Sequence, residues 1–163
     1  PMLESGARRL KRSIIIDINS IKFCSDEDIE KYKKIKYLKD YILDKEKEIK
    51  NYNIEQNTNL ESTLSSINGR KLTNIGTFRA YIINYLKNNS NIRKDMPIVV
   101  KQQQATHQGL PLEIYTFINN IDFTEFESIQ SDIFDHIFAV INEFDLEVYQ
   151  APTGKFAIKY KES

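Results

Sequence analysis

The residues best suited to chemistry are two acids and a histidine close together in the segment SDIFDHIF: Asp132, Asp135 and His136. In a helix, Asp132 and His136 lie one turn apart, so a carboxylate and an imidazole can face one cation. A structural metal site usually needs four protein ligands, and a catalytic site needs at least three. The other histidine, His107, falls in a predicted turn with no acid beside it. We therefore expect no metal here, and expect His136 to be hydrogen-bonded to Asp132 or to lie in an interface.

Other patterns that would indicate catalysis or cofactor binding are missing from the sequence. Cys24 is the only cysteine, and its place at a predicted strand end indicates a small apolar side chain, not an activated thiol. No glycine pattern of a nucleophile elbow surrounds a serine. Gly109 and Gly154 are isolated, so no phosphate-binding loop is predicted. We predict a protein that is not an enzyme, with no catalytic, metal or cofactor-binding residues and no cofactor.

The overall charge weighs against nucleic acid as a partner. The 163 residues hold 23 basic and 23 acidic side chains, whereas nucleic-acid binders usually carry a basic excess. Four basic residues cluster near the N-terminus: Arg8, Arg9, Lys11 and Arg12. Such a cluster can meet anionic lipid or nucleic acid, but a solvated approach to a strand, or a contact with acids of a neighbouring subunit, is the favoured interpretation.

Residues 109–151 are the expected packing nucleus of the domain. A strand over 112–118 directs Leu112, Ile114, Thr116 and Ile118 to one side and Glu113, Tyr115 and Phe117 to the other. Tyr115 and Phe117 can stack on bases, but core packing is the preferred explanation.

Thr124 and Glu127 form an expected capping box before a helix. The helix carries an apolar stripe of Phe126, Ile129, Ile133, Ile137, Val140, Ile141 and Phe144. Strand-like alternation returns at Leu146, Val148 and Tyr149.

The remaining segments supply further strands and helices. We predict a strand over 13–23 and a charged helix from Ser25 to about residue 53, whose first half packs on the sheet and whose second half, from Asp44, projects outward. A polar loop over 53–68 precedes a helix that starts near Thr73. A strand from 98 forms a hairpin with the next strand, and alternation over 155–161 predicts a short C-terminal strand.

This order predicts one α+β domain with a ferredoxin-like βαββαβ sandwich, an insertion of about 44–95 after the first helix, and a short C-terminal strand. No apolar run reaches the roughly 18–20 residues that span a bilayer. Pro1 followed by Met2 does not resemble a natural start, which indicates a piece of a longer protein.

Several segments together resemble one family, the MscS-type (small-conductance) mechanosensitive ion channels. ESGARRLKRS at 4–13 resembles the join between the middle β-domain and the C-terminal domain of these channels. Four other segments are similar to the miniconductance branch: TNIGTFRAY at 73–81, GLPLEIY at 109–115, ESIQSDIFDH at 127–136 and VYQAP at 148–152. The resemblance extends from about Glu4 to Gly154.

The resemblance implies the cytoplasmic domain of a bacterial inner-membrane channel that opens under membrane tension during hypoosmotic stress. It implies a homoheptamer whose hollow cage filters solutes, with the tension-sensing helices upstream of this chain. Residues 1–12 would then end the linker, 13–154 form the C-terminal α/β domain, and 155–163 form the tail, with 155–161 closing a small barrel at the cage base. We expect the isolated chain to be soluble, and monomeric or weakly associated, with no nucleic-acid partner.

Two other functions remain open from the residues alone. A stand-alone ferredoxin-like regulatory domain that binds a small ligand would have no upstream membrane segments. An RNA-binding module would bind single strands in a salt-dependent way.

Overall fold

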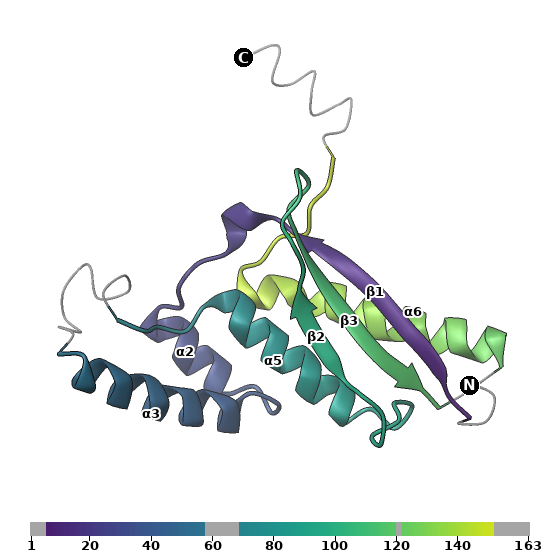
Figure 1. Ribbon diagram of the computed structural model, residues 1–163, viewed down its shortest axis with the longest axis horizontal. Helices are drawn as coiled ribbons and strands as arrows, with labels where there is room; N and C mark the ends of the chain where they lie inside the picture. The colour runs from purple at the N-terminus through teal and green to yellow at the C-terminus, as the bar shows by residue number, and fades with distance from the viewer. Residues whose placement is uncertain (1–5, 58–68, 120–121, 152–163) are drawn as a thin grey trace, which may run out of the picture.

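The computed structural model describes residues 6–57, 69–119 and 122–151. Three antiparallel strands form one sheet in the order β1-β3-β2, where β1 is Arg8–Ile16, β2 is Val99–Gln102 and β3 is Leu110–Ile118. The long central strand β3 pairs with β1 over its whole length and with β2 over four residues (Figure 1). The predicted hairpin between β2 and β3 is confirmed.

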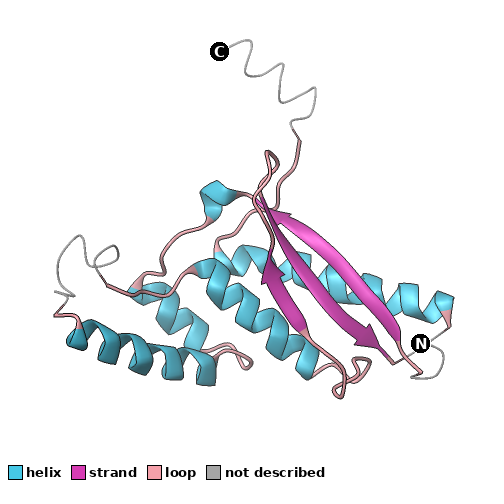
Figure 2. Ribbon diagram, in the orientation of Figure 1, coloured by secondary structure: helices cyan, strands magenta, loops and turns pink. Residues whose placement is uncertain are grey.

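Two helices, α5 (Asn74–Lys87) and α6 (Phe123–Val140), lie against one face of this sheet (Figures 1 and 2). Two others, α2 (Asp26–Lys33) and α3 (Lys39–Glu55), lie beyond α5 and away from the sheet. Short 3-10 helices, η1 (Ile18–Ser20) and η2 (Ile141–Phe144), follow β1 and α6. The described chain is therefore a mixed α+β domain with an antiparallel sheet, as the sequence predicted.

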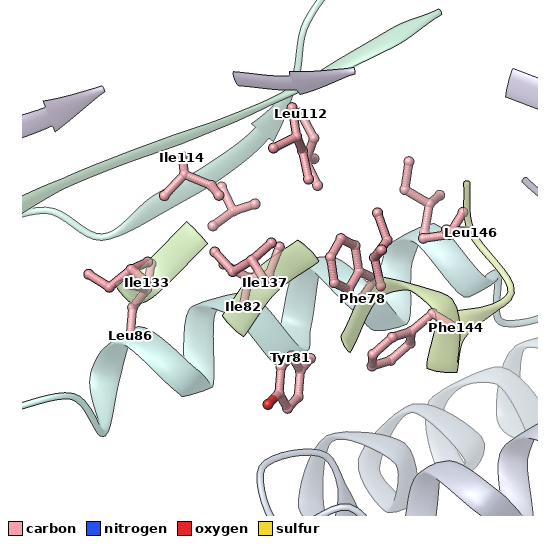
Figure 3. Packing of buried hydrophobic residues seen from close by; sticks show 14 of the residues in the cluster. Phe78, Tyr81, Ile82, Leu86, Leu112, Ile114, Ile133, Ile137, Phe144 and Leu146 are labelled. Carbon is pink, nitrogen blue, oxygen red and sulfur yellow. The ribbon is translucent and has the colours of Figure 1, made fainter. Parts of the chain in front are cut away.

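The largest part of the core lies between the sheet and the two helices, and the same buried cluster continues to Tyr32, Leu38 and Ile42 in the segment that contains α2 and α3. Leu112 and Ile114 point from β3 toward Ile82 of α5 and toward Ile133 and Ile137 of α6 (Figure 3). All four β3 residues predicted to share one side are fully buried: Leu112, Ile114, Thr116 and Ile118. This confirms the predicted alternation of the strand.

The predicted apolar stripe of α6 and η2 is also confirmed. Phe126, Ile133, Ile137, Ile141 and Phe144 are buried, and Ile129 and Val140 pack against them.

The start of α6 differs from the prediction. The helix is capped by Asp122 and not by Thr124, because the Asp122 side chain accepts a hydrogen bond of 3.0 Å from the Glu125 backbone N–H. Aspartate is a strong N-cap residue, and its extended backbone here places it just before the first turn.

Strand β1 begins and ends earlier than expected. It spans Arg8–Ile16, whereas the prediction was 13–23. After Ile16 the chain turns into η1, whose N-cap Asp17 accepts a hydrogen bond of 2.9 Å from the Asn19 N–H.

Two of the clustered basic residues lie over the aromatic rings of α6. The Arg12 guanidinium carbon is 4.2 Å from the centre of the Phe134 ring, and that of Arg8 is 5.4 Å from the Phe126 ring. Cation–π contacts of this kind are attractive. The interpretation of this cluster as a solvated approach to the strand is wrong, because all four basic residues belong to β1 itself.

The charged segment after Ser25 forms two helices instead of one. Ser25 caps α2 as predicted, in a reciprocal capping box with Asp28. The chain then breaks, and α3 begins at Lys39. Helix α2 packs on η2 through Tyr32, whose ring is 5.2 Å from that of Phe144. The expectation that this segment covers the sheet is wrong.

Helix α5 is the helix that covers the sheet beside α6. Our prediction counted it within an insertion of about 44–95, but Phe78, Ile82 and Leu86 are fully buried in the core. The segments outside the two-layer core are α2 and α3, where Leu43 and Ile54 are 47% and 61% exposed.

Among the described residues, a fourth strand is represented only by one isolated bridge. Val148 forms an isolated antiparallel bridge with Ile16, and Tyr149 N–H donates to the Ile15 carbonyl at 2.8 Å. The predicted strand at 155–161 lies outside the described residues. The ferredoxin-like topology and the predicted domain bounds therefore remain predictions.

Candidate functional site

His136 is held by aromatic residues of α5. Its Nε2 atom lies 2.7 Å from the Tyr81 hydroxyl oxygen, and its ring stacks on that of Tyr85 at 4.3 Å and 13°. The predicted bond to Asp132 is not formed, because the imidazole turns toward α5 while Asp132 and Asp135 are exposed on α6. This arrangement joins two helices and leaves the acids at the surface.

The two histidines do not come together with acids in a metal-binding arrangement. His107 is exposed in the hairpin loop between β2 and β3, whereas His136 lies between the helices. Within residues 6–57, 69–119 and 122–151, no group of three or more His, Cys, Asp or Glu side chains is close enough to share a metal ion.

Cys24 is a buried side chain of the core. It is fully buried, and its sulfur lies 4.0 Å from the Thr77 hydroxyl oxygen. Burial raises the pKa of this thiol to about 11, because the thiolate would lose its hydration. The prediction of an unactivated cysteine is confirmed.

We expect Cys24 to react with the thiol reagent DTNB at least about a hundredfold more slowly in the folded protein than in urea. Both burial and the raised pKa lower the concentration of reachable thiolate at pH 8. Absorbance of the released thionitrobenzoate measures the rate. A folded protein that reacts as fast as the unfolded chain would contradict this placement of Cys24.

A cleft of about 530 Å³ lies between α2, α3 and residues 70–72. Its apolar lining comes from Ile29, Ile49 and Leu72. Asn53 is the most buried polar side chain of the lining, and both its amide atoms are bound to the Arg70 backbone, at 2.8 and 3.0 Å. Because that amide is satisfied within the protein, it is not available to orient a ligand.

The sheet face opposite the helices combines aromatic and charged side chains. Tyr115 and Phe117 are half-buried there, with their rings edge to face at 5.5 Å. The core packing that we predicted for this pair is wrong, because both rings are only half-buried and lie outside the buried core cluster.

A polar network lies beside these rings. Glu113 is only 5% exposed, accepts a hydrogen bond of 2.7 Å from the Gln103 amide, and lies 3.7 Å from the Lys101 ammonium. Sequence reasoning did not single out these three residues. Their pairing depends on the β2–β3 register, which sets Lys101 opposite Glu113.

Taken together, these elements define an α+β domain with an antiparallel sheet that two helices cover on one face. Residues 73–148 match the family model described as "Mechanosensitive ion channel MscS, C-terminal". This part of the chain, which contains α5, the β2–β3 hairpin and α6, belongs to that family and is the C-terminal domain of an MscS-type channel. The resemblance seen in the sequence is confirmed at the level of the family.

The match defines the general role of this part of the chain. The domain is the cytoplasmic part of a mechanosensitive ion channel, and domains of this family assemble as oligomers within their channels. The family is one of ion channels and not of enzymes. Across the described parts of the chain, we find no helix with the length and apolar character needed to cross a membrane.

Proposed function

We propose that this chain forms one wall segment of a homoheptameric cage on the cytoplasmic side of a bacterial inner membrane. Upstream membrane helices would sense tension and open the pore during hypoosmotic shock, while the cage filters the solutes that pass. The observation that carries this proposal is the match over 73–148, because it coincides with the helix, hairpin and helix that build the core.

We also propose that the channel belongs to the miniconductance branch. The segments 73–81, 109–115 and 127–136 support this assignment by their resemblance. Helices α2 and α3 precede the matched residues and lie outside the two-layer core, so we propose them as the part added to the simplest form of the domain. Residues 155–161 remain our candidate for a strand of a barrel at the cage base.

The coding sequence upstream of Met2 gives a first test. We expect it to encode, in frame, membrane-spanning helices followed by a β-domain. A start codon directly before Met2, with no membrane segments, would favour a stand-alone regulatory domain instead. Expression of the complete gene in a bacterium that lacks its own mechanosensitive channels is expected to restore survival of hypoosmotic shock.

We expect the isolated 163-residue chain to be monomeric or weakly associated in solution. Ring contacts are weak singly and gain strength when the membrane part gathers the subunits at high effective concentration. Light scattering coupled to gel filtration measures the mass at several protein concentrations. A stable heptamer at micromolar concentration would contradict this expectation.

A further inference from the structure

Two exposed faces of this domain carry opposite charges and lie on opposite sides of it. We propose that the open sheet face of one copy binds the outer face of α6 of the next copy, head to tail around the ring. The open sheet face is defined here by Lys11, Val99, Lys101, Tyr115 and Phe117. The outer face of α6 is defined by Glu127, Ser131, Asp135 and Phe138. This inference rests on the proposed function, since it identifies the surfaces through which the copies meet.

The open sheet face offers an apolar centre with a basic edge. Tyr115 and Phe117 are half-buried on the central strand, and Val99, paired with Tyr115 in β2, is 39% exposed. Lys11 lies opposite Tyr115 in β1, is exposed, and has no acidic partner among the described residues. Lys101 keeps 59% of its side chain exposed although it lies near Glu113. An apolar centre with charges at its edge is typical of a surface for protein contact.

The outer face of α6 has the complementary character. Helix α6 contains acidic residues and, apart from His136, no basic side chain. Glu127 and Asp135 are exposed and make no ion pair with another described residue. Phe138, 37% exposed, lies one turn beyond Asp135. This face thus offers an aromatic ring and unpaired carboxylates to a partner that carries lysines.

The two faces point in opposite directions. Tyr115 and Phe117 alternate along β3 with Ile114 and Thr116, which face the helices. On α6, Ile133 and Ile137 face the sheet (Figure 3), so Asp135, half a turn away from Ile133, points outward. Contact between two different faces is heterologous, which is the type of contact that builds a ring when the rotation between copies closes.

Pairing of two like faces is disfavoured by their charges. Two open sheet faces would set Lys11 and Lys101 of one copy against the same lysines of another, and two outer faces of α6 would oppose carboxylates. Like charges brought together at an interface are unfavourable and act against a wrong partner. Electrostatics therefore selects the head-to-tail arrangement over a two-fold dimer.

Disulfide cross-linking of the complete gene product in membranes tests this arrangement. Because Cys24 is fully buried, it is not expected to cross-link, and any cysteine encoded upstream of this chain is first replaced by serine. We expect a variant with both Val99→Cys and Phe138→Cys to form a ladder of cross-linked copies under mild oxidation. Each single variant is expected to cross-link about tenfold less, because a heterologous contact keeps identical positions apart. The control pair Val99→Cys and Ile54→Cys, with Ile54 on α3, is expected to behave like the singles.

Charge reversal in the double-cysteine background gives a second readout. Lys11→Glu with Lys101→Glu is expected to reduce the ladder about tenfold, and adding Glu127→Lys with Asp135→Lys is expected to restore it. The inference is overturned if Val99→Cys alone cross-links as strongly as the double variant, or if the second reversal gives no recovery. Native mass spectrometry of the same samples distinguishes failure of the proposed interface from failure of the proposed function. A heptamer without the ladder contradicts the interface alone. A monomer contradicts both the interface and the proposed function.

Discussion

Replacing Phe78 by alanine is expected to lower the free energy of unfolding by about 3–5 kcal/mol, the usual cost of removing a buried phenylalanine ring. Phe78 is fully buried on α5, and its ring lies 5.1 Å from that of Phe144 in η2 (Figure 3). The substitution removes the ring where α5 meets η2 and leaves a cavity. The loss arises both from the lost burial of the ring and from the cavity that the neighbours cannot fill.

Urea denaturation followed by far-ultraviolet circular dichroism measures this loss, since the chain has no tryptophan for fluorescence. Phe123→Ala is the matched control, because Phe123 begins α6 and is 62% exposed. The control is expected to lose about 1 kcal/mol or less. Equal losses in the two variants would mean that α5 does not form part of the core.

Replacing Asn74 by alanine is expected to cost about 3 kcal/mol of unfolding free energy, from buried backbone groups left without partners. Asn74 is fully buried at the first turn of α5. Its side-chain oxygen accepts from the Lys22 N–H at 2.9 Å, and its amide nitrogen donates to the carbonyls of Ser20 and Phe144, both at 2.9 Å. One amide thus joins the segment after η1, the start of α5 and the end of η2.

The same denaturation experiment checks this prediction. Asn51→Ala is the matched control, since Asn51 lies exposed within α3, where alanine is a better helix former. We expect the control to be neutral or slightly stabilising. An Asn74 variant as stable as the unmodified chain would show that water replaces all three bonds at no cost.

The elements that the sequence predicted well are those whose burial follows a local period. Alternation along β3 and the helical stripe of α6 each arise from one face packed on a common core, so the period shows directly in the residue types. Ser25 and Thr73 were also foreseen at helix starts, because a hydroxyl cap acts within its own turn.

The errors arose where distant parts of the chain decide the outcome. We predicted that Arg8 and Arg12 form part of a solvated approach to the strand, because no local pattern shows that their guanidinium groups lie over the rings of Phe126 and Phe134. The hydrogen-bond partner of His136 is Tyr81, 55 residues away.

Tertiary packing also decides which helix covers the sheet. Both the segment after Ser25 and α5 have apolar periodicity, but only α5 packs between the sheet and η2. Local sequence patterns carry no information on which of two amphipathic helices lies nearer the sheet.

Single-channel recording tests the central claim most directly. The complete gene product that carries this chain is reconstituted in liposomes, and suction is applied to excised patches while current is recorded. We predict discrete current steps that appear above a threshold of tension and vanish when tension is released. A stably inserted, heptameric product that passes no tension-dependent current would contradict the account.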